Sequence, residues 1–213
     1  MHLLLSAATE MEIEPTISWL RTHQKNDVQI LITGVGLTSA TYAFTKAFTT
    51  SRPRLVIQAG IAGTLDNNVV PGTTVAVRNE CIGDLGVDEN GFRSVFDMQL
   101  ENPDLFPWKN GKLCNDHELL QQSKLPVVDG VTVNEVSTSP ARIEYYRTRW
   151  GATVESMEGA ALHFVALQEK IPFLQIRALS NFAGERDKSK WMMQQAITSL
   201  NTELQTLLTK LSS

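Results

Sequence analysis

The chain has 213 residues, of which 42% are hydrophobic and 20% are charged. This length and composition predict one α/β domain over residues 1–213, with enough apolar surface to bury a core. The formal net charge of −4 argues against an unspecific nucleic-acid binder, because neutralising phosphates requires a surplus of Lys and Arg. The two cysteines, Cys81 and Cys114, are too few and too far apart for a disulfide framework or a zinc site.

The sequence contains no run of 18 apolar residues. The N-terminal run Leu3-Leu4-Leu5 is too short for an export signal and lacks a basic flank. We therefore expect a soluble, cytoplasmic protein that contacts neither membrane nor nucleic acid.

Apolar periodicity predicts strands that alternate with helices along the chain. The first strand should cover residues 2–7 and the first helix should begin near Thr9, which can cap it. Further strands are expected at 28–33, 55–59, 73–78, 127–136, 152–155 and 173–180, and further helices at 38–48, 116–122, 140–150, 158–169 and 189–211. Residues 83–115 are rich in Gly, Asp, Asn and Pro and predict a long excursion, which in a compact domain usually has a function. This alternation predicts a parallel or mixed sheet covered on both faces, with ligands bound outside the strand ends.

Several turns at strand ends are candidates for one pocket. The segment Thr9-Glu10-Met11-Glu12 places acids at a helix start, and Gly34-Val35-Gly36 forms a tight turn before the next helix. Acids in a first helical turn also complement the helix dipole, so position alone does not assign them a function. The glycine turn lacks the third glycine of a dinucleotide site and the Lys-Ser/Thr of a P-loop.

Two later segments suggest a nucleoside as the ligand. Glu158 lies where a strand gives way to a helix, and Asn181 ends an apolar strand. A carboxylate can accept both hydrogen bonds of a ribose diol, and an amide can donate to a purine nitrogen and accept from a ring N–H. Each residue also has a structural interpretation, as a dipole-compensating acid and as a turn-forming Asn.

Taken in order, these segments resemble the purine nucleoside phosphorylase and nucleosidase superfamily along almost the whole chain. The matching stretches are the acidic turn at Glu12, Gly34-Val35-Gly36, Gly60-Ile61-Ala62-Gly63, Met157-Glu158-Gly159-Ala160-Ala161 and Arg177-Ala178-Leu179-Ser180-Asn181. The resemblance implies a three-layer α/β/α sandwich with a central mixed, partly barrel-like sheet. Within the superfamily the chain is most similar to the futalosine hydrolases, through Cys81-Ile82-Gly83-Asp84-Leu85-Gly86, Glu155-Ser156-Met157-Glu158-Gly159, and Ser180-Asn181 followed by Gly184-Glu185-Arg186-Asp187 and Trp191.

The resemblance implies hydrolysis of an N-glycosidic bond with release of hypoxanthine, without a metal or organic cofactor. Glu12 would activate water and Asn181 would stabilise the leaving base. The implied substrate-binding residues are Glu158, Met157, Ser156, Val35, Gly36, Ile61, Ala62, Gly63, Val133 and Asn134. The family's base-stacking aromatic has no clear counterpart, and Val133-Asn134 falls near that position. Relatives form homodimers or larger homo-oligomers, so the same is expected here.

Asn181 suits a 6-oxopurine better than adenine, because methylthioadenosine nucleosidases usually have Asp at this position and Glu in place of Ser156. The 5′ substituent of futalosine carries a benzoate, which an arginine should meet; Arg93, Arg142 and Arg186 are the candidates. The alternatives are a methylthioadenosine/adenosylhomocysteine nucleosidase, a purine nucleoside phosphorylase, and a non-catalytic nucleoside-binding protein.

Overall fold

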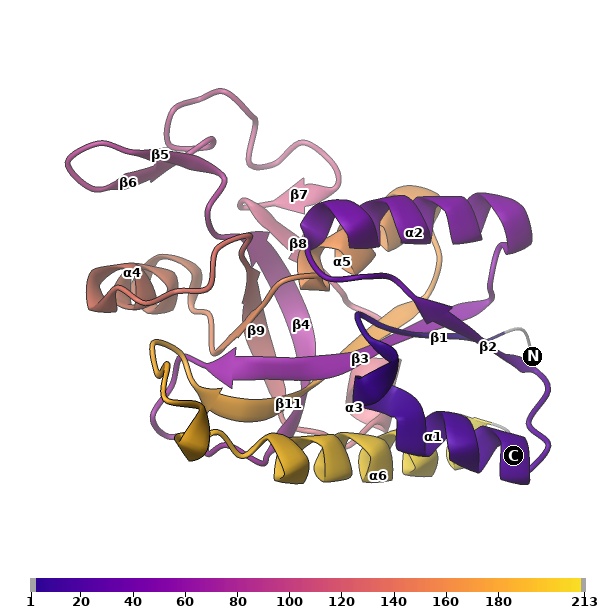
Figure 1. The fold of residues 1–213 in the computed structure, drawn as a ribbon. Helices are drawn as coiled ribbons and strands as arrows, with labels where there is room; N and C mark the ends of the chain where they lie inside the picture. Colours follow the sequence, from indigo (N-terminus) through magenta and orange to yellow (C-terminus); the bar gives the residue numbers. More distant parts are fainter. Residues whose placement is uncertain (1–2, 212–213) are drawn as a thin grey trace.

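A mixed β-sheet forms the centre of the computed structural model, which describes residues 3–211 (Figure 1). The central strands are nearly continuous apolar runs, as expected for strands covered on both faces, and Leu4, Leu5, Val56 and Ile57 are inaccessible to solvent. In chain order the strands are β1 (Leu3–Ala7), β2 (Val28–Ile32), β3 (Leu55–Thr64), β4 (Thr74–Ile82), β5 (Gly86–Asp88), β6 (Phe92–Ser94), β7 (Trp108–Lys109), β8 (Lys112–Cys114), β9 (Val127–Thr132), β10 (Val154–Ser156) and β11 (Phe173–Phe182).

Five of these strands close into a barrel. β3 pairs in parallel with β11, β11 pairs antiparallel with β4, and β4 pairs in parallel with β9. The ring is completed by β10, which is parallel to β9 and antiparallel to β3. β1 and β2 extend the parallel sheet from β3, while β8 and β7 extend it from β4. The predicted α/β fold with a mixed, partly barrel-like sheet is therefore confirmed.

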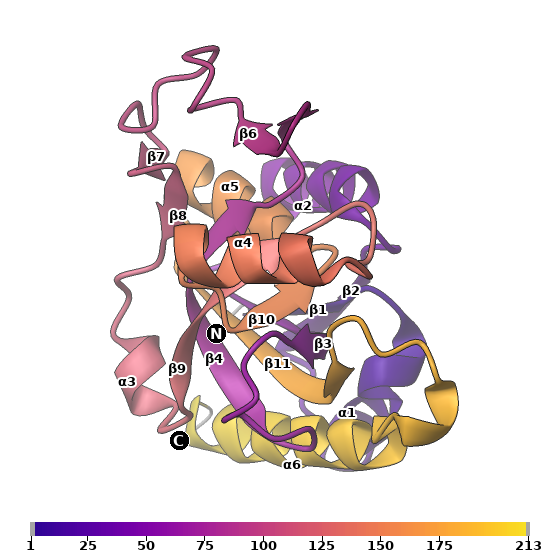
Figure 2. The ribbon, with the colours of Figure 1, turned by 90° about the vertical axis from the view of Figure 1, so that its left-hand side faces the viewer.

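Helices cover the sheet on two faces, as Figure 1 shows. α1 (Glu10–Thr22) and α6 (Met193–Leu211) pack on one face, with the apolar stripe of α6 in the same core as Ile13 and Ile57. α2 (Leu37–Ser51) and α5 (Gly159–Glu169) cover the other. α4 (Pro140–Trp150) lies across one end of the barrel, in front of it in Figure 2, and the short α3 is Leu119–Gln122. Among residues 3–211 no helix is long and apolar enough to cross a bilayer.

The structure differs from the predicted elements at several strand and helix ends. β3 continues beyond its predicted end at residue 59, because residues 60–63 pair with β11 on one side and residues 63–64 also pair with β10 on the other. β9 ends at Thr132, four residues before the predicted end, and residues 133–139 form a loop. The 83–115 excursion contains the β5–β6 hairpin and strands β7 and β8. His2, the predicted start of the first strand, lies outside the described residues.

Candidate active site

A cavity of about 290 Å³ lies where the ends of β1, β3, β10 and β11 meet. This is the arrangement expected of an open α/β sheet, in which the turns after the strands collect at one edge. Nine of the twelve residues predicted for the site line this cavity: Glu12, Val35, Ile61, Ala62, Gly63, Ser156, Met157, Glu158 and Asn181. The two acids at positions 12 and 158 therefore face the same space.

Glu12 is held in place by the start of α1. Its Oε2 accepts hydrogen bonds from the Thr9 backbone N–H and the Thr9 hydroxyl, both at 2.9 Å, which completes a capping box. Its Oε1 accepts a hydrogen bond from the Ile61 N–H at 3.0 Å. The carboxylate is thereby fixed between α1 and β3 in one orientation at the cavity wall.

Glu158 is the N-cap residue of α5, and the turn that precedes α2 holds its carboxylate. Its Oε1 accepts a hydrogen bond from the Gly36 N–H at 3.0 Å, and its Oε2 lies 3.6 Å from Nη1 of Arg177. Gly36 thus acts on the site through Glu158, although it does not line the cavity. Arg177 is almost completely buried, and its Nε and Nη2 have no hydrogen-bond partner among the described residues.

Gly60 on β3 lies next to both Arg177 and Glu12. A Cβ built at Gly60 would collide with Nη1 of Arg177 and would lie 3.0 Å from Oε1 of Glu12. The absence of a side chain at this position of β3 lets the guanidinium and the carboxylate approach the strand together. Arg177 therefore lies beside Gly60 together with Glu12, and it also pairs with Glu158.

Asn181 lies on the other side of the cavity, just after a bulge in β11. The register of β11 against β3 shifts between Leu179 and Asn181, which places Asn181 opposite Gly63. The amide Oδ1 accepts a hydrogen bond from the Ser180 hydroxyl at 2.8 Å, and Nδ2 donates to the Phe182 carbonyl at 2.9 Å. The second N–H of the amide takes no part in these two hydrogen bonds, so the side chain can donate it to a ligand.

Val133 and Asn134 are not at the cavity. Val133 is fully buried in an apolar cluster with Tyr146, and the Asn134 backbone and side chain both donate to Asp84. Because β9 ends at Thr132, the loop turns and brings Val136 to the cavity wall instead. An aromatic residue, Trp191, also lines the cavity, and its Nε1 donates to the Glu185 carbonyl at 3.1 Å.

Glu155 is a cavity residue that the sequence analysis did not assign. It is buried on β10, and its Oε1 accepts a hydrogen bond from the Ser137 N–H at 3.0 Å, while Oε2 has no partner among the described residues. Burial raises the pKa of this carboxyl above its usual value. Gly63 of β3 is paired with Glu155 of β10 on one side and with Asn181 of β11 on the other. In the sequence, Glu155 belongs to the stretch Glu155-Ser156-Met157-Glu158-Gly159 but was given no role of its own.

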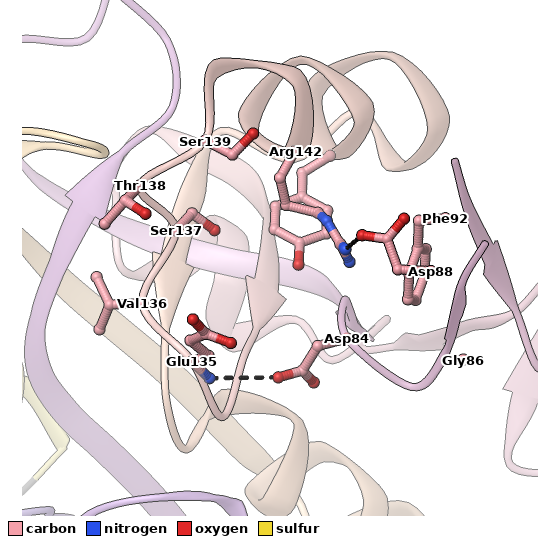
Figure 3. Close-up of a pocket in the computed structure, with 11 residues that line it drawn as sticks. Asp84, Gly86, Asp88, Phe92, Glu135, Val136, Ser137, Thr138, Ser139 and Arg142 are labelled. Carbon is pink, nitrogen blue, oxygen red and sulfur yellow. Dashed lines mark hydrogen bonds and ion pairs between the residues drawn. The ribbon is translucent and has the colours of Figure 1, made fainter. Parts of the chain in front are cut away.

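The three candidate arginines lie in different places. Arg186 lines the cavity, whereas Arg93 lies on the β5–β6 hairpin. Arg142 faces a second cavity of about 390 Å³, where it forms an ion pair with Asp88 and lies 4.2 Å above the Phe92 ring (Figure 3). The loop that carries Val136 separates this second cavity from the first, since Val136 lines both. The structure therefore brings only Arg186 of the three to the wall of the first cavity.

No group of three His, Cys, Asp or Glu side chains suited to a metal ion occurs within residues 3–211. The cavity instead offers the carboxyl groups of Glu12, Glu155, Glu158 and Glu185, the Asn181 amide and a largely apolar wall. These groups can bind a polar sugar and an aromatic base side by side.

Comparison with known proteins agrees with the resemblance found in the sequence. The phosphorylase superfamily model matches residues 16–212. A futalosine hydrolase of Thermus thermophilus is 31% identical over 84% of this chain and 80% of its own length. A 5′-methylthioadenosine/S-adenosylhomocysteine nucleosidase of Tolumonas auensis is 27% identical over 77% of this chain and 72% of its own. The solved futalosine hydrolase of Helicobacter pylori has the same fold, with a TM-score of 0.82, 14% identity, and coverage of 98% of this chain and 97% of that one. The chain belongs to the phosphorylase superfamily.

Proposed function

We propose that this protein hydrolyses the N-glycosidic bond of futalosine and releases hypoxanthine. The observation that carries the proposal is the placement of Glu12, Glu158 and Asn181 around one cavity. The futalosine hydrolase relative, with 31% identity over most of both chains, supports the choice of substrate.

The three polar groups match the charges that develop as the bond breaks. The ribose acquires oxocarbenium character and the purine acquires negative charge, so a catalyst has to stabilise both. Glu158 accepts the hydrogen bonds of the ribose 2′- and 3′-hydroxyls and holds a negative charge beside the cationic sugar. Asn181 donates its free N–H to N7 or O6 of the leaving base, and Glu12 orients and deprotonates the attacking water.

Water is favoured over phosphate as the nucleophile by the charge of the first turn. Glu10 and Glu12 place two carboxylates there, and Glu12 is fixed at the cavity wall by Thr9 and Ile61. A phosphate dianion at the same position would be repelled by these carboxylates.

The hydrogen bonds of Asn181 support a preference for 6-oxopurines. Its Oδ1 already accepts from the Ser180 hydroxyl, while one N–H of its amide takes no part in the hydrogen bonds to Ser180 and Phe182, which supports donation to a carbonyl such as O6 of hypoxanthine. An adenine 6-amino group at the same place would face another donor, which costs about 1–3 kcal/mol. Arg186 at the cavity wall is the group we assign to the carboxylate of the 5′ substituent.

This function implies a role in menaquinone biosynthesis through futalosine, in the cytoplasm, by a homo-oligomer that needs no cofactor. The second candidate is a methylthioadenosine or adenosylhomocysteine nucleosidase. It is favoured by the exposed apolar side chains of Met11 and Val35 at the cavity, which suit a thioether substituent.

The test is to incubate the purified protein with futalosine, inosine and methylthioadenosine, each with and without phosphate, and to identify the released base. Hypoxanthine released from futalosine without phosphate supports the proposal. Adenine release from methylthioadenosine alone supports the second candidate, strict dependence on phosphate indicates a phosphorylase, and binding without turnover indicates a nucleoside-binding protein. A Glu12→Gln preparation made in parallel controls for contaminating nucleosidases.

A further inference from the structure

A further buried acid, Glu80, lies inside the barrel next to the start of α5, and it does not line the cavity. Glu80 on β4 is inaccessible to solvent. Its Oε1 accepts a hydrogen bond from Nε2 of Gln175 at 2.8 Å, and its Oε2 accepts one from the Thr132 hydroxyl at 3.0 Å. Both carboxyl oxygens are therefore used as acceptors.

The same hydroxyl connects Glu80 to the helix that begins after Glu158. Oγ1 of Thr132 accepts a hydrogen bond from the Ala160 N–H at 2.8 Å, which satisfies one of the free N–H groups in the first turn of α5. Because this hydroxyl accepts from Ala160, its own proton points to Glu80. A Cβ built at Gly159 would collide with Oε1 of Glu80, so the helix start rests directly on this carboxyl group.

Among the charged groups around Glu80, Arg177 is the cation that interacts with its carboxylate. Gln175 and Arg177 face it from β11, and Arg177 also pairs with Glu158 at 3.6 Å. Thr132 and Asp129 face it from β9, where Lys112 of β8 neutralises Asp129 at 2.8 Å. From α5, His163 lies close to Gln175, and its burial lowers the pKa of the imidazole to about 4, so it is neutral near pH 7.

We infer that Glu80 is a positioning residue, which fixes the start of α5 through Thr132 and shares the charge of Arg177 with Glu158. It thereby sets the place of the carboxylate that binds the ribose. This inference rests on the proposed function for the role of Glu158, whereas the contacts of Glu80 themselves are independent of the substrate.

Protonation of Glu80 breaks this arrangement. Burial raises the pKa of the carboxyl to about 7, so the group titrates in the working range of the enzyme. The neutral form carries an O–H. On Oε1 this proton would oppose the Gln175 amide donor, and on Oε2 it would require the Thr132 hydroxyl to turn its own proton away from Glu80. Loss of the charge also removes one of the two anions that interact with Arg177, and its ion pair with Glu158 remains. We expect the site to bind ribose more tightly above about pH 7 than below it.

The test compares Glu80→Gln with the wild-type protein in pH profiles of kcat and KM between about pH 5.5 and 8.5. The wild type should lose activity below about pH 7. Glu80→Gln, which imitates the neutral acid in size and hydrogen bonding, should have kcat/KM reduced roughly tenfold at pH 8 and should lack the inflection near 7.

Three further variants separate positioning from a general loss of structure. Thr132→Val removes the hydroxyl at constant volume and should imitate Glu80→Gln, whereas Thr132→Ser keeps the hydroxyl and should restore both the activity and the inflection. Asp129→Asn removes a nearby carboxylate that contacts neither Thr132 nor Gln175, so it should keep the inflection. Thermal unfolding of each variant shows whether it is folded.

Inosine binding, measured by calorimetry at about pH 6 and pH 8, each roughly one unit from the titration midpoint, is a second readout. Glu12→Gln is introduced into every protein compared in this measurement, so that turnover is suppressed. Weaker binding at the lower pH in the wild type, and no difference in Glu80→Gln, supports the inference. An inflection near 7 that persists in Glu80→Gln, or Thr132→Ser behaving like Thr132→Val, overturns it. If the wild type cleaves methylthioadenosine instead of futalosine, the proposed function fails, and the same profiles with that nucleoside still decide the role of Glu80.

Discussion

Substitution of Gly60 by alanine tests whether the two acids and the arginine depend on the close approach of β3. The new Cβ would lie 3.0 Å from Oε1 of Glu12 and would collide with Nη1 of Arg177. Ordinary contacts to carbon are about 3.5–4.0 Å, so the Glu12 carboxylate has to retreat by at least about half an ångström and the guanidinium by more.

Overpacking of this kind costs about 1–3 kcal/mol of stability. For a chain of 213 residues this corresponds to a fall in Tm of roughly 2–12 °C. Displacement of Glu12 and of Arg177, the partner of Glu158, should lower kcat/KM by a further factor of about 10 to 100, because catalysis is sensitive to shifts of this size.

The assay combines steady-state release of hypoxanthine from futalosine with thermal unfolding of the same preparation. Gly63→Ala is the matched control for stability, since its Cβ would lie 3.7 Å from its nearest neighbours, an ordinary contact, on the same strand. Gly60→Ala should unfold at a clearly lower temperature than Gly63→Ala. If Gly60→Ala retains both the wild-type Tm and the wild-type kcat/KM, the packing of Arg177 and Glu12 against β3 does not hold the site together.

Three other changes test the separate roles of site and core residues. Glu12→Gln should reduce turnover at least about a thousandfold while leaving the fold intact by circular dichroism, because the amide cannot take a proton from water; an unchanged rate would remove Glu12 from the role of base. Asn181→Asp should shift the ratio of kcat/KM towards methylthioadenosine over inosine, and a constant ratio would assign base selection to other residues. His163 has its pKa lowered by burial to about 4, so unfolding takes up a proton between about 4 and 6.5. The neutral His163 contributes at most about 3 kcal/mol to the free energy of unfolding. This contribution is complete above about pH 6.5 and is lost as the pH falls towards 4. The Tm of the wild type should therefore fall more steeply between pH 6.5 and pH 4.5 than that of His163→Gln, and parallel curves would contradict this assignment.

Helices with clear ends were the best-predicted parts of the fold. α4 occupies Pro140–Trp150 as predicted, since proline favours the first turn of a helix and Gly151 adopts the left-handed conformation that ends it. The end of β3 was missed because local sequence in Gly60-Ile61-Ala62-Gly63 favours a turn, whereas pairing with β10 and β11 keeps it extended. The end of such a strand depends on pairing with strands from distant parts of the chain, which the local sequence does not encode.

The same distinction holds for the site. Glu12, Glu158 and Asn181 could be placed at strand ends from the sequence, and their meeting in one cavity followed from the rule for α/β sheets. Val136 could not be found, because the loop reaches the cavity only after β9 stops at Thr132. Glu80 could not be found either, since the hydrogen bonds that define it join residues 52 and 95 positions away.

β3 is hydrogen-bonded to β1, β11 and β10, so the strand that carries Ile61, Ala62 and Gly63 cannot shift without disturbing three ladders at once. The floor of the cavity is consequently a rigid template. Among the cavity-lining segments outside these ladders, 133–139 and 183–191 contain none of Glu12, Glu158 and Asn181, so adaptation to different substituents is expected there. Transplanting those segments between nucleosidases is accordingly the most economical route to a new substrate range.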